Sequence, residues 1–195
     1  RNLTITGELD AATLDISGNA DIDGTLNTDG LTNAGNFSTD GGTIKLDGNY
    51  PTGTGNVALG DAALSSGSLS GGNNTVIGRS VGAANTSGAD NTGVGSFSLC
   101  ANISGDLNTA VGRSALRANT TADNNTAIGS YALQSNTTGA ANTAVGTCAL
   151  QNVDANGNNA FGYFALYNTS SGTCNVAIGQ DNTRCNTTGS CNVSI

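Results

Sequence analysis

Five cysteines, fourteen acidic residues and eight aromatic residues are the side chains with which this chain could do chemistry, because it contains no histidine, methionine or tryptophan. Without histidine, catalytic triads, HExxH zinc sites and imidazole proton relays are excluded. Asp106 and Asp123 lie one repeat period apart and could stack as a carboxylate pair. A general acid/base pair needs a cleft that repeated coils do not offer. We therefore expect no enzyme, no catalytic residue and no cofactor.

The segment Asn19, Asp21 and Asp23 copies the first half of a calcium loop, in which alternate oxygens converge on a hard cation. The glutamate that closes such a loop is missing, because Gly30 stands at the twelfth position. We expect an Asp-Gly turn here rather than calcium, and no metal site.

Three of the five cysteines gather near the end of the chain. Cys174 and Cys191 are one period apart, so stacking would bring their Cα atoms near disulfide distance. A bridge between Cys185 and Cys191 is the alternative. The odd number of cysteines also leaves one thiol for an interchain bond or for simple burial.

Half of the aromatic residues lie between positions 161 and 167. Tyr163, Phe164 and Tyr167 could form a platform on which sugar rings stack, or they could widen or plug a shared core. We favour the core over the glycan contact.

The elements that must position these side chains come from a repeat of about 17 residues, N-T-A-[VI]-G-x-x-A-L-x-x-N-T-T-G-x-x. A short fixed period predicts stacked rungs. Rungs about 4.8 Å apart would place the first asparagine of each unit above the next, with each carboxamide bonding its neighbour. We predict a structural amide ladder rather than a binding site, formed by Asn56, Asn74, Asn91, Asn108, Asn125, Asn142, Asn158, Asn175 and Asn192.

The fourth position of every unit is apolar, and this regularity predicts an inward core column. A glycine follows it in all eight complete units and indicates a bend. Leucine four residues later forms a second column, broken by Gly82 and Thr183. The predicted core column comprises Leu59, Ile77, Val94, Val111, Ile128, Val145, Phe161, Ile178 and Ile195.

These features predict an all-β fold, a parallel β-solenoid of β-roll or β-helix type with about one 17-residue unit per coil. Two large apolar residues per coil bury little surface, so we expect several chains to share one core, with small alanines allowing close approach. The ninth unit stops at Ile195, and we expect more sequence to follow it.

Three segments follow from the change in pattern. Residues 1–48 contain short segments that each end on glycine, and they predict a β-rich shaft or collar. Residues 49–55 are the joint, and residues 56–195 hold eight complete solenoid units and a truncated ninth. The net charge of −8 opposes binding to nucleic acid, and no apolar run is long enough for membrane insertion.

The NTAVGxxALxxNTTG units resemble the repeats of phage tail fibres and are similar to NSVAIG-type repeats in the heads of trimeric autotransporter adhesins. The opening LTITGELDAATLDISGNADIDGTL also resembles a phage fibre shaft. The resemblance implies a parallel homotrimer that projects from a virion, joins tail or baseplate proteins, and contacts a surface glycan or protein receptor of a bacterial host.

Three alternatives stay open, of which the most distant is an enzyme, such as a depolymerising tailspike, that would act through Asp106 or Asp123. A bacterial trimeric surface adhesin would carry the same head on the cell surface, followed by a membrane-anchoring β-barrel. An ice-binding β-solenoid would use a threonine column to order water. That column comprises Thr75, Thr92, Thr109, Thr126 and Thr143.

Overall fold

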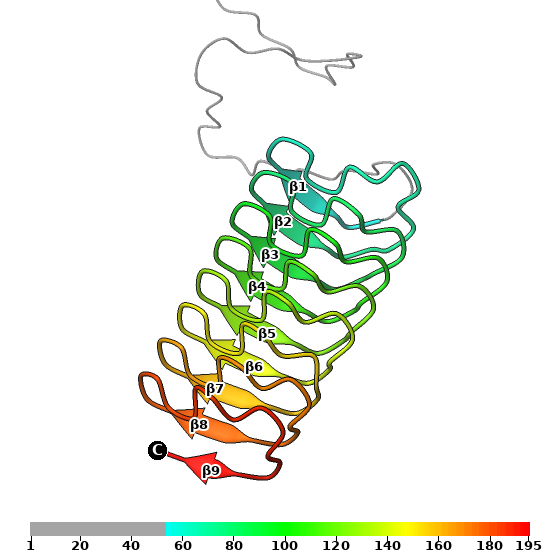
Figure 1. Ribbon diagram of the computed structural model, residues 1–195. Helices are drawn as coiled ribbons and strands as arrows, with labels where there is room; N and C mark the ends of the chain where they lie inside the picture. The colour runs from blue at the N-terminus through cyan, green and yellow to red at the C-terminus, as the bar shows by residue number, and fades with distance from the viewer. Residues whose placement is uncertain (1–53) are drawn as a thin grey trace, which may run out of the picture. The chain divides into compact units, whose positions relative to one another are not determined.

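The computed structural model describes residues 54–195, which form a single β-solenoid (Figure 1). The predicted shaft at 1–48, including the Asn19–Asp23 turn, and positions 49–53 of the joint lie outside the described residues. The prediction of an all-β parallel solenoid with about 17 residues per coil is confirmed. Its strands are β1 (Val57–Leu59), β2 (Thr75–Ile77), β3 (Thr92–Val94), β4 (Thr109–Val111), β5 (Thr126–Ile128), β6 (Thr143–Val145), β7 (Asn159–Phe161), β8 (Val176–Ile178) and β9 (Val193–Ser194).

The strands pair in parallel and in chain order, so β1 to β9 form one sheet along one side of the coil (Figure 1). We number positions from the first asparagine of each unit and coils from Asn56.

Hydrogen bonds between coils continue beyond the strands. For example, the N–H of Leu116 donates to the carbonyl of Ala132 at 3.0 Å, and that of Ala118 donates to Gln134 at 3.0 Å. Each coil is thus bonded to its neighbours on both of its walls.

Glycine at position 5 is required by both backbone conformation and space. Gly129 has a φ of +137°, and a Cβ built there would lie 2.5 Å from the carbonyl oxygen of Gly146 in the next coil. A side chain would strain the backbone and push adjacent coils apart. This position therefore ends each strand after three residues.

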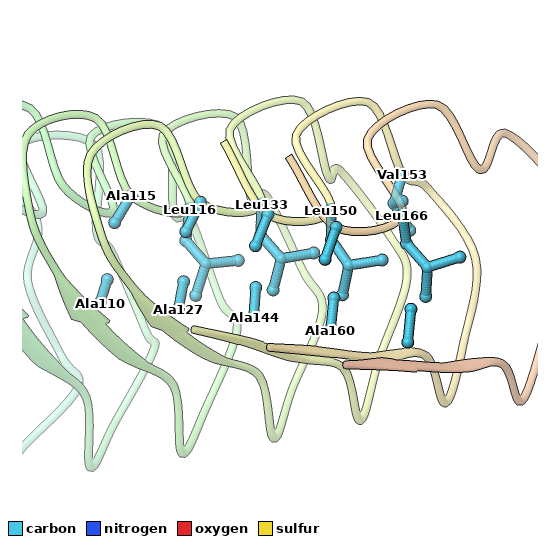
Figure 2. Close-up of a cluster of buried hydrophobic side chains, with 14 of the residues drawn as sticks. Ala110, Ala115, Leu116, Ala127, Leu133, Ala144, Leu150, Val153, Ala160 and Leu166 are labelled. Atoms are coloured by element: carbon cyan, nitrogen blue, oxygen red, sulfur yellow. The ribbon is translucent and has the colours of Figure 1, made fainter. Parts of the chain in front are cut away.

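The core is a thin layer between the sheet and the opposite wall of the coil. Leu116, Leu133 and Leu150, from position 9, lie in a row above the alanines of the strands, such as Ala127 and Ala144 (Figure 2). All five side chains are completely buried. The second, leucine column predicted from the sequence is therefore inside the coil, and the alanines opposite these three leucines leave space for them.

The predicted inward column at position 4 is wrong for the single chain. Leu59, Ile77, Ile128, Phe161 and Ile178 keep 40–42% of their surface exposed, Ile195 keeps 90%, and Val94, Val111 and Val145 are half-buried. The reason is the alternation of strand side chains. Positions 1 and 3 share one face, so burying the asparagines also turns position 3 inward and position 4 outward. The alanines accordingly line the interior rather than an interface between chains.

Coil 2 shows how the thin core compensates for a missing leucine. Gly82 occupies position 9 there, and the buried Val81 fills the interior instead. A Cβ at Gly93, on the strand of the next coil, would lie 2.5 Å from a methyl group of Val81. The loss of one leucine is therefore matched by a valine beside it and a glycine facing that valine.

Candidate functional site

The asparagines at position 1 lie stacked inside the coil, and each side chain makes bonds in two directions. Oδ1 of Asn125 accepts the backbone N–H of Asn142 at 2.9 Å, while its Nδ2 donates to the carbonyl of Gly139 at 2.9 Å. The first bond joins two coils, and the second closes the bend before the next strand. Oδ1 accepts the next coil's backbone N–H in this way along the whole stack from Asn56 to Asn192.

Burial excludes this ladder as a contact surface. Eight of the nine asparagines are buried, and Asn192, just before β9, is exposed. Because their amide groups bond to the protein itself, they have no free polar atoms to offer a ligand. The ladder positions the outward residues between its members, which is a structural role.

A second asparagine ladder at position 12 was missed in the sequence. Nδ2 of Asn119 donates to Oδ1 of Asn102 at 2.8 Å, and Nδ2 of Asn136 donates to Oδ1 of Asn119 at 3.3 Å. These side chains are fully or almost fully buried. The signal was the recurrence of asparagine at one further fixed position. The ladder stops where Val153 replaces asparagine, and Oδ1 of Asn136 is left without a partner.

In the shortened coil 6, the residue after Val153 is Asp154, and its carboxylate accepts hydrogen bonds from the backbone of the coil before. Oδ1 of Asp154 accepts the backbone N–H groups of Thr137, Thr138 and Gly139 at 3.0, 2.7 and 3.1 Å. Burial raises the pKa of Asp154, but the hydrogen bonds from the Thr137 hydroxyl and these amides outweigh it and hold the pKa below its ordinary value. Between coils 4 and 5 the equivalent acceptor is a backbone carbonyl, because the N–H of Thr120 donates to the carbonyl of Thr137 at 3.1 Å.

Asp106 and Asp123 also accept backbone N–H groups from the coil before. Oδ1 of Asp123 accepts the backbone N–H of Asp106 at 2.8 Å, and Oδ1 of Asp106 accepts that of Ala89 at 2.7 Å. Each carboxylate is thus used to satisfy a backbone amide one coil away. We see in them a structural role.

The outward face of the sheet carries two parallel columns of side chains. Threonines at position 2 are half-buried, and the aliphatic residues at position 4 are exposed or half-buried. The strand register places Thr109 beside Thr126 and Val111 beside Ile128. We call this surface the outer sheet face. It is an apolar stripe on the surface of the chain, and such stripes mark sites of interaction.

The predicted aromatic cluster lies outside the coil rather than in its core. The rings of Tyr163 and Phe164 have centroids 4.3 Å apart, and those of Phe164 and Tyr167 are 4.9 Å apart, both edge to face. The guanidinium of Arg184 lies over the Phe164 ring at 4.5 Å. Tyr163 is 48% exposed, and Phe164 and Tyr167 are half-buried. These three residues do not contribute to the interior of the single coil, and their place in a core shared between chains stays a prediction.

The cysteines are all present as free thiols. Cys174 and Cys191 occupy position 17 of adjacent coils, where both are exposed, and Cys185 is exposed as well. Cys148 is half-buried, and this burial raises the pKa of its thiol.

Within residues 54–195 there is no helix long and apolar enough to cross a membrane. No group of three or more metal-ligating side chains occurs in the same part of the chain. Comparisons with protein-family models, with curated proteins and with solved structures find no match for this chain.

Proposed function

We propose that this chain is a segment of a structural and host-attachment fibre, of the phage tail-fibre kind, in which three copies associate through the outer sheet face. The number of copies rests on the resemblance of the repeats to trimeric fibres and adhesin heads. The segment would belong to a virion, joined to tail or baseplate proteins, and would carry or present a receptor-binding surface to a bacterial host.

The observation that supports association is the exposed column at position 4. The interior is already filled by buried leucine, alanine and valine side chains, so this column adds nothing to the interior of the single chain. Exposed isoleucine, leucine and phenylalanine side chains nevertheless recur along the stack, for example at Ile77, Ile128 and Ile178. Covering them with equivalent columns of other copies would remove this surface from water at about 25 cal/mol per Å².

Association also suits attachment. Copies aligned in parallel would repeat every receptor contact around the fibre, and linked weak contacts raise the overall affinity by orders of magnitude. The low content of charged residues, the stacked amides and the rigid repeat fit a spacer that holds such contacts away from a particle.

Cell binding tests this function. The complete chain, labelled at its amino terminus, is incubated with a panel of Gram-negative and Gram-positive cells, beside Ile128→Asp and the matched control Thr121→Asp. We expect saturable binding to at least one strain, with Thr121→Asp unchanged and Ile128→Asp weaker by about tenfold or more because avidity is lost. Absence of binding to every strain would contradict the attachment function.

One observation favours a second candidate, an ice-binding solenoid. The threonines of β2 to β6 lie in register on the outer sheet face, each beside an aliphatic side chain. A regular array of hydroxyl and methyl groups could order water, provided that the face is not covered by other copies. Thermal hysteresis of a concentrated solution tests this candidate, and its absence would exclude it.

A further inference from the structure

The bend that follows the strands concentrates basic and aromatic side chains on one edge of the solenoid. All four arginines of residues 54–195, and five of the six aromatic residues in that range, lie at positions 6, 7 or 10 of their coils. We call this edge the arginine–aromatic stripe. Its members are Arg79, Phe97, Arg113, Arg117, Tyr131, Tyr163, Phe164, Tyr167 and Arg184.

The arginines of the stripe stack on aromatic rings of neighbouring coils. The ring of Phe97 has Arg79 at 5.2 Å from the coil before and Arg117 at 5.9 Å from the coil after. Arg113 lies 5.3 Å from the ring of Tyr131 and donates a hydrogen bond to its hydroxyl. A stacked guanidinium is held in place while the edge that carries its N–H groups stays available for an anion.

A shallow depression adjoins these pairs. It has a volume of about 440 Å³ and is lined by Ala101, Arg117, Ala118, Gln134 and Ser135. Its lining combines the small side chains of two alanines with the longer side chains of Arg117 and Gln134. Nε2 of Gln151 donates to Oε1 of Gln134 at 2.8 Å, so the depression is bordered by ordered amides.

We propose that the arginine–aromatic stripe binds a linear polysaccharide that carries carboxylates, running along the solenoid axis. Sugar rings would stack on the exposed parts of the aromatic rings, and arginine forks would pair with carboxylates. The glutamine amides and Ser135 match a ligand rich in hydroxyl groups. The inference rests on the attachment function proposed above and names the chemical class of the receptor.

The sparse charge favours a polysaccharide over a nucleic acid. The arginines come from coils 2, 4 and 8, and adjacent coils are about 4.8 Å apart. A nucleic acid carries a charge at every phosphate and needs a denser basic surface. Asp61 and Asp181 lie on the same edge at its two ends, and Asp181 pairs with Arg184 at 3.2 Å. These carboxylates would further disfavour a densely charged polymer.

The repeat itself supplies variants that should preserve the fold. Position 7 holds serine in coils 2 and 4, position 6 holds serine in coils 3 and 5, and position 10 holds glutamine in coils 5 and 6. The variants Phe97→Ser, Arg113→Ser and Arg117→Gln therefore install residues that the same backbone already accepts. Thr121→Asp, on the far bend, is the control for net charge.

Binding of the complete chain to polygalacturonate and to alginate, with dextran as the neutral control and oligo(dT) as the nucleic acid, tests the proposal. We expect salt-dependent binding to at least one acidic polysaccharide and none to dextran. Arg113→Ser/Arg117→Gln should weaken it about tenfold or more, Phe97→Ser by a smaller factor, and Thr121→Asp not at all.

Three results would overturn the proposal: no binding to either acidic polysaccharide, binding that the stripe variants leave unchanged, or tighter binding to oligo(dT). The molar mass of the same samples and the cell-binding assay show whether the proposed attachment function fails as well, or only the proposed class of receptor. If the chain associates and binds cells but not these polysaccharides, the fibre stands and only the class of receptor is wrong.

Discussion

Positions 3 and 4 of each strand are neighbours in the sequence and face opposite environments. Ala127 is completely buried, whereas Ile128, the larger side chain, is 42% exposed. Large aliphatic residues are ordinarily the ones inside. The difference teaches that the interior is too thin for large side chains from both walls, because Leu133 from the opposite wall already fills it (Figure 2). The bulk displaced to the outside forms the surface through which we propose that copies associate.

The largest expected effect comes from placing a carboxylate at the inward position 3 and, in a separate variant, at the outward position 4. Ala127→Asp would bury a carboxylate with no partner, so we expect at least about 3 kcal/mol of destabilisation or no folded protein. Ile128→Asp, one residue later, should leave a folded chain that no longer associates. Circular dichroism during thermal unfolding compares the stability of the two variants, and the molar mass in solution shows whether Ile128→Asp associates. An Ala127→Asp protein as stable as the wild type would refute the assignment of the inward face.

Shortening a side chain inside the coil and shortening one on the outer sheet face should both reduce stability. Only the second loss should depend on protein concentration. Leu133→Ala should lower the free energy of unfolding by about 2–5 kcal/mol at any concentration, because it leaves a cavity inside the coil. Ile128→Ala should lose only the stability that association contributes. Its unfolding midpoint should therefore approach that of the wild type on dilution, where both are dissociated. Urea unfolding at two protein concentrations tells them apart, and a concentration-dependent loss for Leu133→Ala would count against a core within each chain.

Removal of a ladder amide should have an intermediate effect. Asn125→Ala leaves the backbone N–H of Asn142 and the carbonyl of Gly139 without this partner, and we expect a loss of about 2–3 kcal/mol. The exposed Asn152 is the control, and Asn152→Ala should stay within about 0.5 kcal/mol of the wild type. Equal losses in the two variants, measured by urea unfolding, would argue against the structural role of the ladder.

The smallest effect concerns Asp154, whose carboxylate replaces a carbonyl at the break in the second ladder. Its pKa in the folded chain is lowered, so its stabilising contribution is complete above the unfolded value of about 3.9. That contribution is lost as the pH falls through the folded pKa. Wild type should therefore exceed Asp154→Asn in thermal stability at pH 6, with the gap closing below about pH 4. A gap that is constant between pH 6 and pH 3 would contradict this account.

The periodic features were predictable from the sequence because every coil repeats them. The 17-residue period, the coil architecture and the stack from Asn56 to Asn192 follow from the spacing of one residue type. The direction of position 4 was also within reach, since burying Asn125 forces Ile128 outward by strand alternation. Regularity alone does not say which face of a strand is inside.

The features that depend on non-periodic residues were not predictable. The match between Val81 and Gly93 requires knowing that the two side chains meet across the core. The pairing of Arg113 with Tyr131 requires knowing that positions 6 and 7 of adjacent coils lie side by side at a bend. The position of Tyr163, Phe164 and Tyr167 outside the coil was not predictable either, because aromatic composition does not reveal on which side of the backbone a side chain lies.

The central claim is that the outer sheet face is covered by other copies of the chain. The molar mass of the complete chain, determined by light scattering during size exclusion, tests it most directly. The account predicts three times the subunit mass of 19.1 kDa for the wild type and for Thr121→Asp, and a single subunit for Ile128→Asp. A wild-type chain that is monomeric at every concentration, or an Ile128→Asp variant that stays associated, would contradict it.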